Sequence, residues 1–159
     1  MIDQQAIWQA LEGVKDPEIP ALSVVELGVI RNVHVAGQAV TVDFAPTFAG
    51  CPALDVMRAA IEARLRVLGA STVVVRLVLS PPWTTDFISD AGRAKLKAFG
   101  LSPPPRHNGL IQILFAEEAA CPYCDSTDTT LKNSFGPTLC RAIYVCNTCR
   151  QPFEQFKPL

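Results

Sequence analysis

The sequence predicts a small α/β protein, a two-layer sandwich in the order helix, strand, strand, helix, strand, followed by a cysteine-rich tail. Residues 40–44 alternate between apolar and polar, as in a half-buried strand. Residues 54–68 carry an apolar stripe at i+3/i+4 spacing, which is typical of an amphipathic helix. The β-branched run 72–79 predicts a further strand. With 159 residues, the chain is long enough for one ordinary domain and a small appendix.

The N-terminal segment predicts a helix and then a hairpin. Asp3 is of a type that caps helices, and Pro17 ends the helical pattern. The apolar face of this helix is formed by Ile7, Trp8, Leu11 and Val14. The β-branched segment Ser23–Val35 predicts a strand region with a bend at Gly28. Gly37-Gln38 is then the hairpin turn before the alternating strand.

Cys51 precedes the second predicted helix. Pro52 suits the first position of that helix, which places Cys51 at the helix N-terminus. Free N–H groups and the helix dipole there favour a thiolate, which can bind a metal or act as a nucleophile. The alternative is a small buried cysteine at a strand–helix junction.

The run Thr72–Leu79 is almost continuously apolar and is interrupted only by Arg76. This pattern predicts a central strand covered on both faces. The intervening helix makes the connection a crossover, so the last two strands of the sandwich are expected to be parallel.

Proline clusters mark the joints of the chain. Trp83 and Asp86 follow the first cluster, and we interpret them as a surface patch that contacts a partner; the alternative is that Trp83 and Phe87 cover the end of the sheet. A short helix is expected from Ser89 or Asp90 to Phe99, and a strand over Leu110–Phe115. The expected segments are a sandwich domain, a Trp- and Pro-rich linker with a short helix, and a cysteine-rich domain: 1–80, 81–109 and 110–159.

Two CxxC pairs dominate the tail, Cys121/Cys124 and Cys146/Cys149, separated by 21 residues. This spacing allows four thiolates to form a tetrahedral site of the kind that binds structural Zn²⁺, so the tail is predicted to be zinc-ribbon-like. Redox-active iron in the same cage and disulfides are the alternatives. Cys140 has no near partner and is a spare buried thiol, an alternate ligand or a second reactive site.

The stiff loop Asp16-Pro17-Glu18-Ile19-Pro20 contains two carboxylates between prolines. Asp16 and Glu18 could orient a neighbouring group. The alternative is an aspartate that caps a turn beside a solvated glutamate.

Composition argues against several classes of protein, namely nucleic-acid-binding, membrane-spanning and secreted proteins. The net charge of −1 gives no overall basic field for nucleic acid, and the tail has four basic and five acidic residues. No run of 18 apolar residues predicts a membrane span, and the N-terminus lacks the features of a signal peptide. Six cysteines, four of them in CxxC pairs, indicate metal chemistry in a reducing compartment, so the expected location is the cytoplasm.

Three motifs together resemble a known family: Asp16-Pro17-Glu18-Ile19-Pro20, Leu27-Gly28-Val29-Ile30-Arg31 and Thr47 to Pro52. They are similar to the metal–sulfur cluster assembly domain of SufT and its cytosolic relatives, over Met1 to about Leu79. The whole chain resembles the PaaD family, the D subunits of the phenylacetyl-CoA epoxidase system, with Phe87 at a position where we expect tryptophan. The motifs are Ser80–Asp86, Pro103–Pro105, both CxxC pairs, Ser134–Gly136, Cys140–Ala142 and Gln151–Phe153.

The resemblance implies an accessory subunit, not itself an enzyme, of an oxygenase that makes the ring epoxide of phenylacetyl-CoA. It implies help in maturing an iron centre of a partner, above all the iron–sulfur reductase. The site would be Asp16, Glu18, Thr47 and Cys51, which would handle a transient iron–sulfur cluster or iron, and a homodimer would supply two Cys51 thiolates. The zinc tail and the Trp83 patch would be docking surfaces.

Two other functions are kept in view. The first is a structural adaptor of the oxygenase with no metal besides the zinc. The second is a nucleic-acid module, a use that zinc ribbons often serve, but the charge balance of the tail argues against phosphate binding.

Overall fold

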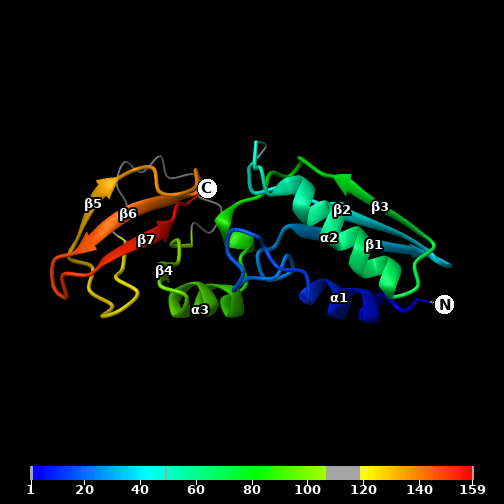
Figure 1. Ribbon diagram of the computed structural model, residues 1–159, viewed down its shortest axis with the longest axis horizontal. Helices are drawn as coiled ribbons and strands as arrows, with labels where there is room; N and C mark the ends of the chain where they lie inside the picture. The colour runs from blue at the N-terminus through cyan, green and yellow to red at the C-terminus, as the bar shows by residue number, and fades with distance from the viewer. Residues whose placement is uncertain (1, 49, 107–118, 159) are drawn as a thin grey trace. The chain divides into compact units, whose positions relative to one another are not determined.

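The computed structural model describes residues 2–48, 50–106 and 119–158, which form two compact units, 1–92 and 93–159 (Figure 1). The first unit contains α1 (Gln4–Glu12), β1 (Ile30–Ala36), β2 (Ala39–Phe44), α2 (Leu54–Val67), β3 (Thr72–Leu77) and the short 3₁₀ helix η1 (Thr85–Phe87). The predicted helix–strand–strand–helix–strand order is confirmed. The three segments expected from the sequence, 1–80, 81–109 and 110–159, stay a prediction.

The sheet of the first unit has the order β1-β2-β3, with β1 antiparallel and β3 parallel to β2. Helices α1 and α2 cover one face of this sheet (Figure 1). Apolar side chains that repeat at helical spacing on both helices meet the inward side chains of the strands. The buried core includes Ile7, Leu11, Val40, Val42, Phe44, Met57, Ile61 and Leu65. The two-layer α/β sandwich is therefore confirmed.

The predicted central position of β3 is wrong, because β2 is the central strand and β3 lies at the edge. Within β3 only Val75 is buried, while Val74 and Leu77 are exposed. A continuous apolar run indicates burial on two faces only when neighbouring elements cover both, and here the helices lie on one face. The apolar character of β3 therefore needs another explanation.

The strand expected over Ser23–Val35 begins only at Ile30. Ser23 and Glu26 instead form a reciprocal capping box: the Ser23 N–H donates to Glu26 Oε2 at 3.0 Å, and the Glu26 N–H donates to Ser23 Oγ at 3.0 Å. The Leu27 N–H then donates to the Ser23 carbonyl at 2.9 Å, which closes one helical turn. This S-x-x-E signal outweighs the strand propensity of the valines between them.

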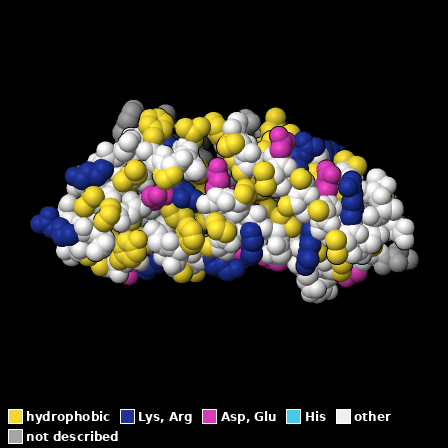
Figure 2. Space-filling model, in the orientation of Figure 1, with side chains coloured by type: hydrophobic (Ala, Val, Ile, Leu, Met, Phe, Trp, Pro, Cys, Tyr) yellow, Lys and Arg dark blue, Asp and Glu magenta, His cyan; other side chains and the backbone are white. Residues whose placement is uncertain are grey.

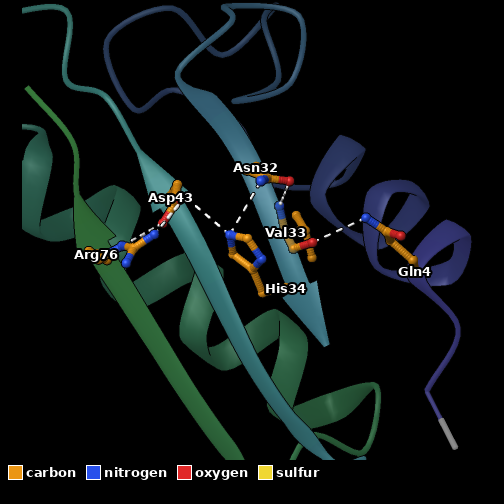
Figure 3. Close-up of polar contacts among 6 residues, drawn as sticks. All are labelled: Gln4, Asn32, Val33, His34, Asp43 and Arg76. Atoms are coloured by element: carbon orange, nitrogen blue, oxygen red, sulfur yellow. Dashed lines mark hydrogen bonds and ion pairs between the residues drawn. The ribbon is translucent and has the colours of Figure 1, made fainter. Parts of the chain in front are cut away.

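A polar network crosses the sheet on side chains of all three strands (Figure 3). Arg76 on β3 holds the buried carboxylate of Asp43 on β2 with two hydrogen bonds, Nε–Oδ1 at 2.7 Å and Nη2–Oδ2 at 2.9 Å. His34 Nε2 on β1 lies 3.4 Å from Asp43 Oδ2 and 3.2 Å from Asn32 Nδ2. The positive charge of Arg76 on the edge strand β3 is thus paired with the negative charge of Asp43 on β2.

The hydrogen bond from Arg76 lowers the pKa of Asp43 below its ordinary value, although burial of the carboxyl acts in the opposite direction. A depressed folded-state pKa means that the ionised carboxylate stabilises the fold above about pH 4, and that this contribution is lost as the pH falls through the folded pKa. We therefore expect Arg76→Gln to lower the urea midpoint at pH 7, with a difference from wild type that shrinks progressively below about pH 4.

The measurement is urea unfolding followed by tryptophan fluorescence at several pH values. Arg66→Gln is the matched control, because the ion pair of Arg66 is an i,i+4 contact with Glu62 at 3.7 Å on the helix surface, and its loss should matter little at any pH. A difference between Arg76→Gln and wild type that is the same at pH 7 and at pH 3 would contradict the assigned role of Asp43.

The second unit contains most of α3 (Asp90–Ala98), then β4 (Leu101–Ser102), β5 (Thr129–Asn133), β6 (Arg141–Cys146) and β7 (Pro152–Phe156). Its sheet has the order β4-β7-β6-β5. The short helix is confirmed, and the strand expected over Leu110–Phe115 lies outside the described residues. The core is small and includes two cysteines: Ala119, Cys121, Ala142, Tyr144, Cys146 and Phe153. Tyr144 and Phe153 stack with their ring centroids 5.7 Å apart.

Surface charge is mixed. On the face drawn in Figure 2, basic and acidic side chains are interspersed among apolar ones, in keeping with the net charge of −1. Among the helices of the described residues, none has the length and apolar character needed to cross a membrane.

Candidate functional site

The four CxxC cysteines meet in space. The Sγ atoms of Cys121, Cys124, Cys146 and Cys149 all lie within 4.8 Å of one another. Cys121 and Cys149 approach to 3.7 Å, and Cys124 and Cys146 to 3.5 Å. These distances are far longer than a disulfide bond of about 2.05 Å, and all four cysteines are free. They fit a tetrahedral Zn²⁺ site, in which Zn–S bonds of about 2.3 Å place sulfurs about 3.8 Å apart.

The two CxxC segments have the same backbone geometry. In the first, the Asp125 N–H donates to the Cys121 carbonyl at 2.9 Å; in the second, the Arg150 N–H donates to the Cys146 carbonyl at 3.0 Å. Asp125 and Arg150 both have left-handed backbone conformations, with φ of 60° and 64°. Each turn therefore reverses directly after its second cysteine, which directs both thiols of a pair toward one centre.

A polar network that sequence reasoning missed joins the second CxxC turn to β5. Within this turn, Asn147 donates from its backbone N–H to the Asp128 carbonyl at 2.9 Å and from Nδ2 to Asp128 Oδ1 at 2.7 Å. Its side-chain oxygen accepts from Thr130 at 3.2 Å, and Ser126 contacts Thr148 at 2.8 Å. The sequence signal for this network was the polar residues inside the second CxxC motif and after the first one. These residues can form hydrogen bonds with each other only when the two turns meet.

Crowding of the thiols creates competition for protons. The Cys149 N–H, 3.4 Å from Cys146 Sγ, lowers the pKa of the Cys146 thiol to about 6. At Cys124 the backbone N–H of Ser126 acts in the same direction, but desolvation and the neighbouring sulfurs outweigh it and raise the pKa to about 12. A divalent cation resolves this conflict, because every ligand sulfur binds it as a thiolate.

In the first unit, Asp16 organises the acidic loop. Its buried Oδ1 accepts hydrogen bonds from the N–H groups of Glu18 at 2.7 Å and Ile19 at 2.9 Å. The backbone closes the loop, with the Asp16 N–H donating to the Leu22 carbonyl at 3.0 Å. The carboxylate of Asp16 thus fixes the path of the chain, as in the capped-turn alternative, and the half-buried Glu18 lies on the loop so formed.

Cys51 lies in the loop after β2, separated from α2 by two residues, rather than directly at the N-terminus of that helix as predicted. Helix α2 begins at Leu54, three residues later, and Pro52 belongs to the turn. The Cys51 N–H donates to the Phe48 carbonyl and its own carbonyl accepts from Leu54, both at 3.1 Å. Its side chain is half-buried, and so is Thr47 at the start of the same loop. Assembly of these two with Asp16 and Glu18 into one site stays a prediction.

Comparisons with known proteins cover both units. Residues 112–157 match the family described as "PaaD zinc beta ribbon domain", and residues 4–75 match that described as "Iron-sulfur cluster assembly protein". A protein of Escherichia coli (strain K12), named as the D subunit of a "Putative 1,2-phenylacetyl-CoA epoxidase", is 41% identical over 151 residues, which are 95% of this chain and 90% of the relative. The chain belongs to the PaaD family.

Solved structures resemble more than half of this PaaD-family chain. A conserved hypothetical protein from Thermotoga maritima is 29% identical, with a TM-score of 0.52, over 60% of this chain and 94% of that chain. A domain of unknown function, DUF59, from Bacillus anthracis has a TM-score of 0.55 at 24% identity, over 58% of this chain and 90% of that chain, and shows the fold alone.

The zinc-ribbon match identifies the four-cysteine cluster of this PaaD-family chain as the metal site of a zinc ribbon. Cys140 lies outside this group in the β5–β6 loop, where Thr138 Oγ1 is 3.1 Å from its sulfur. A separate role for the Cys140 thiol stays a prediction.

The expected exposure of Trp83 is wrong. The side chain is only 6% exposed, and its indole N–H donates to the Leu27 carbonyl at 3.0 Å. A buried indole N–H needs an acceptor, and the helical turn that ends at Leu27 presents one. Trp83 therefore anchors its own segment inside the PaaD-family fold. Contact with a partner through the half-exposed Asp86 in the same segment stays a prediction.

Proposed function

We propose that this chain is an accessory component of a phenylacetyl-CoA ring epoxidase that helps to mature or deliver an iron–sulfur cluster, or iron, for a partner subunit such as the reductase. The match of residues 4–75 to the iron–sulfur cluster assembly family carries this proposal. The relation of 95% of the chain to a protein named as an epoxidase component supports the epoxidase as the setting. Under this proposal other subunits perform the oxygen chemistry.

Cys51 is the residue that we propose handles the cargo. A cysteine thiolate is the usual protein ligand of iron–sulfur clusters, and Cys51 lies half-exposed beside the exposed Gly50. A single protein thiolate leaves the other cluster positions for small thiols or for the recipient, so the cargo can be released. Asp16 and Glu18 would orient the thiol or accept its proton, and Thr47 would complete the site.

The ribbon metal has a separate role in this proposal. Four thiolates around one Zn²⁺ leave no open coordination position, so the site holds the second unit together and does no chemistry. Six cysteines without a disulfide among them fit a reducing compartment, which supports a cytoplasmic location.

The test is co-expression with the reductase, without oxygen, of wild type, Cys51→Ser and Cys140→Ser. We expect Cys51→Ser to reduce the iron and acid-labile sulfide bound to the purified reductase at least about tenfold, because its cluster would no longer be delivered. Cys140→Ser, the same atom exchange outside the motif, should leave both contents unchanged. Full cluster content of the reductase with Cys51→Ser would reject the proposal.

A structural adaptor is the second candidate. It is favoured by Phe135 and Leu139, two large apolar side chains that are exposed on the β5–β6 loop of the ribbon. In that case the Cys51→Ser chain should still co-elute with the oxygenase subunits in fixed stoichiometry, and the reductase should keep its cluster.

A further inference from the structure

The outer edge of β3 is an unprotected sheet edge. Within the described residues β3 pairs only with β2, so one row of its backbone N–H and C=O groups has no strand beside it. All six residues of β3 stay in register with β2, without a bulge. The strand Thr-Val-Val-Val-Arg-Leu contains neither lysine nor proline, and its one charged side chain, Arg76, is engaged by Asp43 of the neighbouring strand β2. Natural proteins normally disrupt such an edge by one of these devices, because a flat apolar edge recruits another strand.

The opposite edge shows those devices. Strand β1 has a register irregularity between Ile30 and Asn32, and it carries the polar side chains of Asn32 and His34. A bulge and polar side chains both discourage strand addition. The sheet is thus protected at β1 and open at β3, which selects β3 as the edge that pairs with another strand.

We propose that the strand that pairs with β3 is β3 of a second copy of this chain, antiparallel across a two-fold axis at Val74. In this register Val73 of one chain lies opposite Val75 of the other, and the two Val74 residues lie opposite each other. The β-branched centres of the two strands therefore pair. Val74 is 49% exposed in the single chain although it occupies the middle of a strand. The pairing would produce one continuous six-stranded sheet.

The two-fold rotation also brings together exposed apolar side chains at the two ends of β3. Val67 and Leu68, at the end of α2 shortly before β3, are exposed, with Val67 at 81%. Leu77 and Leu79, at the other end of the strand, are also exposed. Antiparallel pairing at Val74 brings the Leu77 end of β3 toward the start of β3 in the second copy, which follows the end of α2 that carries Val67 and Leu68. Apolar groups that are solvated in the single chain thereby cover each other.

Charge does not oppose this arrangement. The one charged side chain of β3, Arg76, already forms its two hydrogen bonds to Asp43 within its own chain (Figure 3). In the proposed register Arg76 faces Thr72 of the second copy, so no two like charges lie opposite each other.

The pairing has a consequence for Cys51. β2 and β3 are parallel, so the Cys51 turn follows β2 at the end of the sheet where β3 also finishes. Antiparallel pairing puts these ends of the two copies at opposite ends of the shared strand pair, roughly 20 Å apart for six residues. Each copy would therefore hold its own Cys51 site, and the two Cys51 thiolates would not share one cluster.

The test is the mass of the zinc-loaded 159-residue chain by light scattering across a wide concentration range. We expect twice the 17.2 kDa chain mass for wild type and at least about a tenfold higher dimer dissociation constant for Val74→Lys. Val56→Lys is the control, because it adds the same charge at an exposed valine on α2 and should leave the dimer intact. A monomeric wild type, or a Val74→Lys chain that dimerises as well as wild type, would overturn the proposal.

A photoreactive benzophenone side chain in place of Val74 tests the register without relying on a destabilised variant. Cross-links between isotope-labelled and unlabelled copies should map to 72–76 of the second copy. Cross-links elsewhere on the second copy, or only to an oxygenase subunit in the assembled complex, would reject self-pairing of β3.

Discussion

Replacing Cys146 with serine is expected to empty the metal site and unfold the ribbon, while the first unit keeps its structure. Cys146 is fully buried, and its sulfur is both a metal ligand and part of the small ribbon core. Apparent binding free energies of structural Zn²⁺ reach about 10–16 kcal/mol, which is comparable to the whole stability of a typical domain, about 5–15 kcal/mol. The remaining core, with one aromatic stack, is too small to compensate.

The measurement combines metal content by mass spectrometry with amide chemical shifts of the folded chain. Signals of β5, β6 and β7 should collapse to unfolded positions, and signals of the first sheet should persist. Cys140→Ser is the matched control, since it exchanges the same atom outside the four-sulfur group and should retain one zinc per chain. A Cys146→Ser chain with dispersed ribbon signals and no metal would show that the ribbon folds by its apolar core alone.

The metal cage was predictable because its signal is local. Two CxxC turns fix the distance between paired thiols, and the interval between them is long enough for the chain to return. The helices were predictable for a similar reason, because their apolar stripes repeat within a few residues. At α2 the predicted start came two residues early, since Pro52 also suits the turn that precedes the helix.

Features that depend on tertiary neighbours were not predictable in this way. The sequence of β3 reads like a central strand, but the order of strands in the sheet decides which strand is covered. The pairing of Arg76 with Asp43 depends on the parallel register of β2 and β3. Burial of Trp83 depends on an acceptor 56 residues away in the chain, the Leu27 carbonyl. The Cys51 site stays a prediction for the same reason, because its residues come from separate loops.

The segment after β3 is held against the helical turn of residues 23–28 by several contacts. The Trp83 indole donates to Leu27, and the Ser89 N–H donates to the Glu26 carbonyl at 2.9 Å. Arg31 extends over the Phe87 ring, 3.5 Å from its centroid, and Nη2 lies 3.3 Å from the Pro82 carbonyl. These contacts require the backbone of residue 87 to approach residue 28 more closely than a side chain there would permit.

Gly28→Ala is accordingly expected to destabilise the first unit by about 2–5 kcal/mol, the sum of a left-handed backbone penalty and a steric clash. Gly28 has φ of 73°, and a Cβ there would lie 2.7 Å from the Phe87 carbonyl carbon and closer still to its oxygen. Because those atoms belong to the backbone, relief of the clash must displace the segment that carries Trp83.

Gly37→Ala separates the two causes. Gly37 has a similar φ of 65° in the hairpin turn, but a Cβ there would meet nothing within 4 Å, so only the backbone penalty of about 1–2 kcal/mol applies. Thermal unfolding monitored by tryptophan fluorescence should show a fall in Tm on the order of 10 °C or more for Gly28→Ala and a smaller one for Gly37→Ala. Equal losses at both positions would mean that the close approach of Phe87 to Gly28 contributes nothing, and that the segment carrying Trp83 is anchored by its other contacts alone.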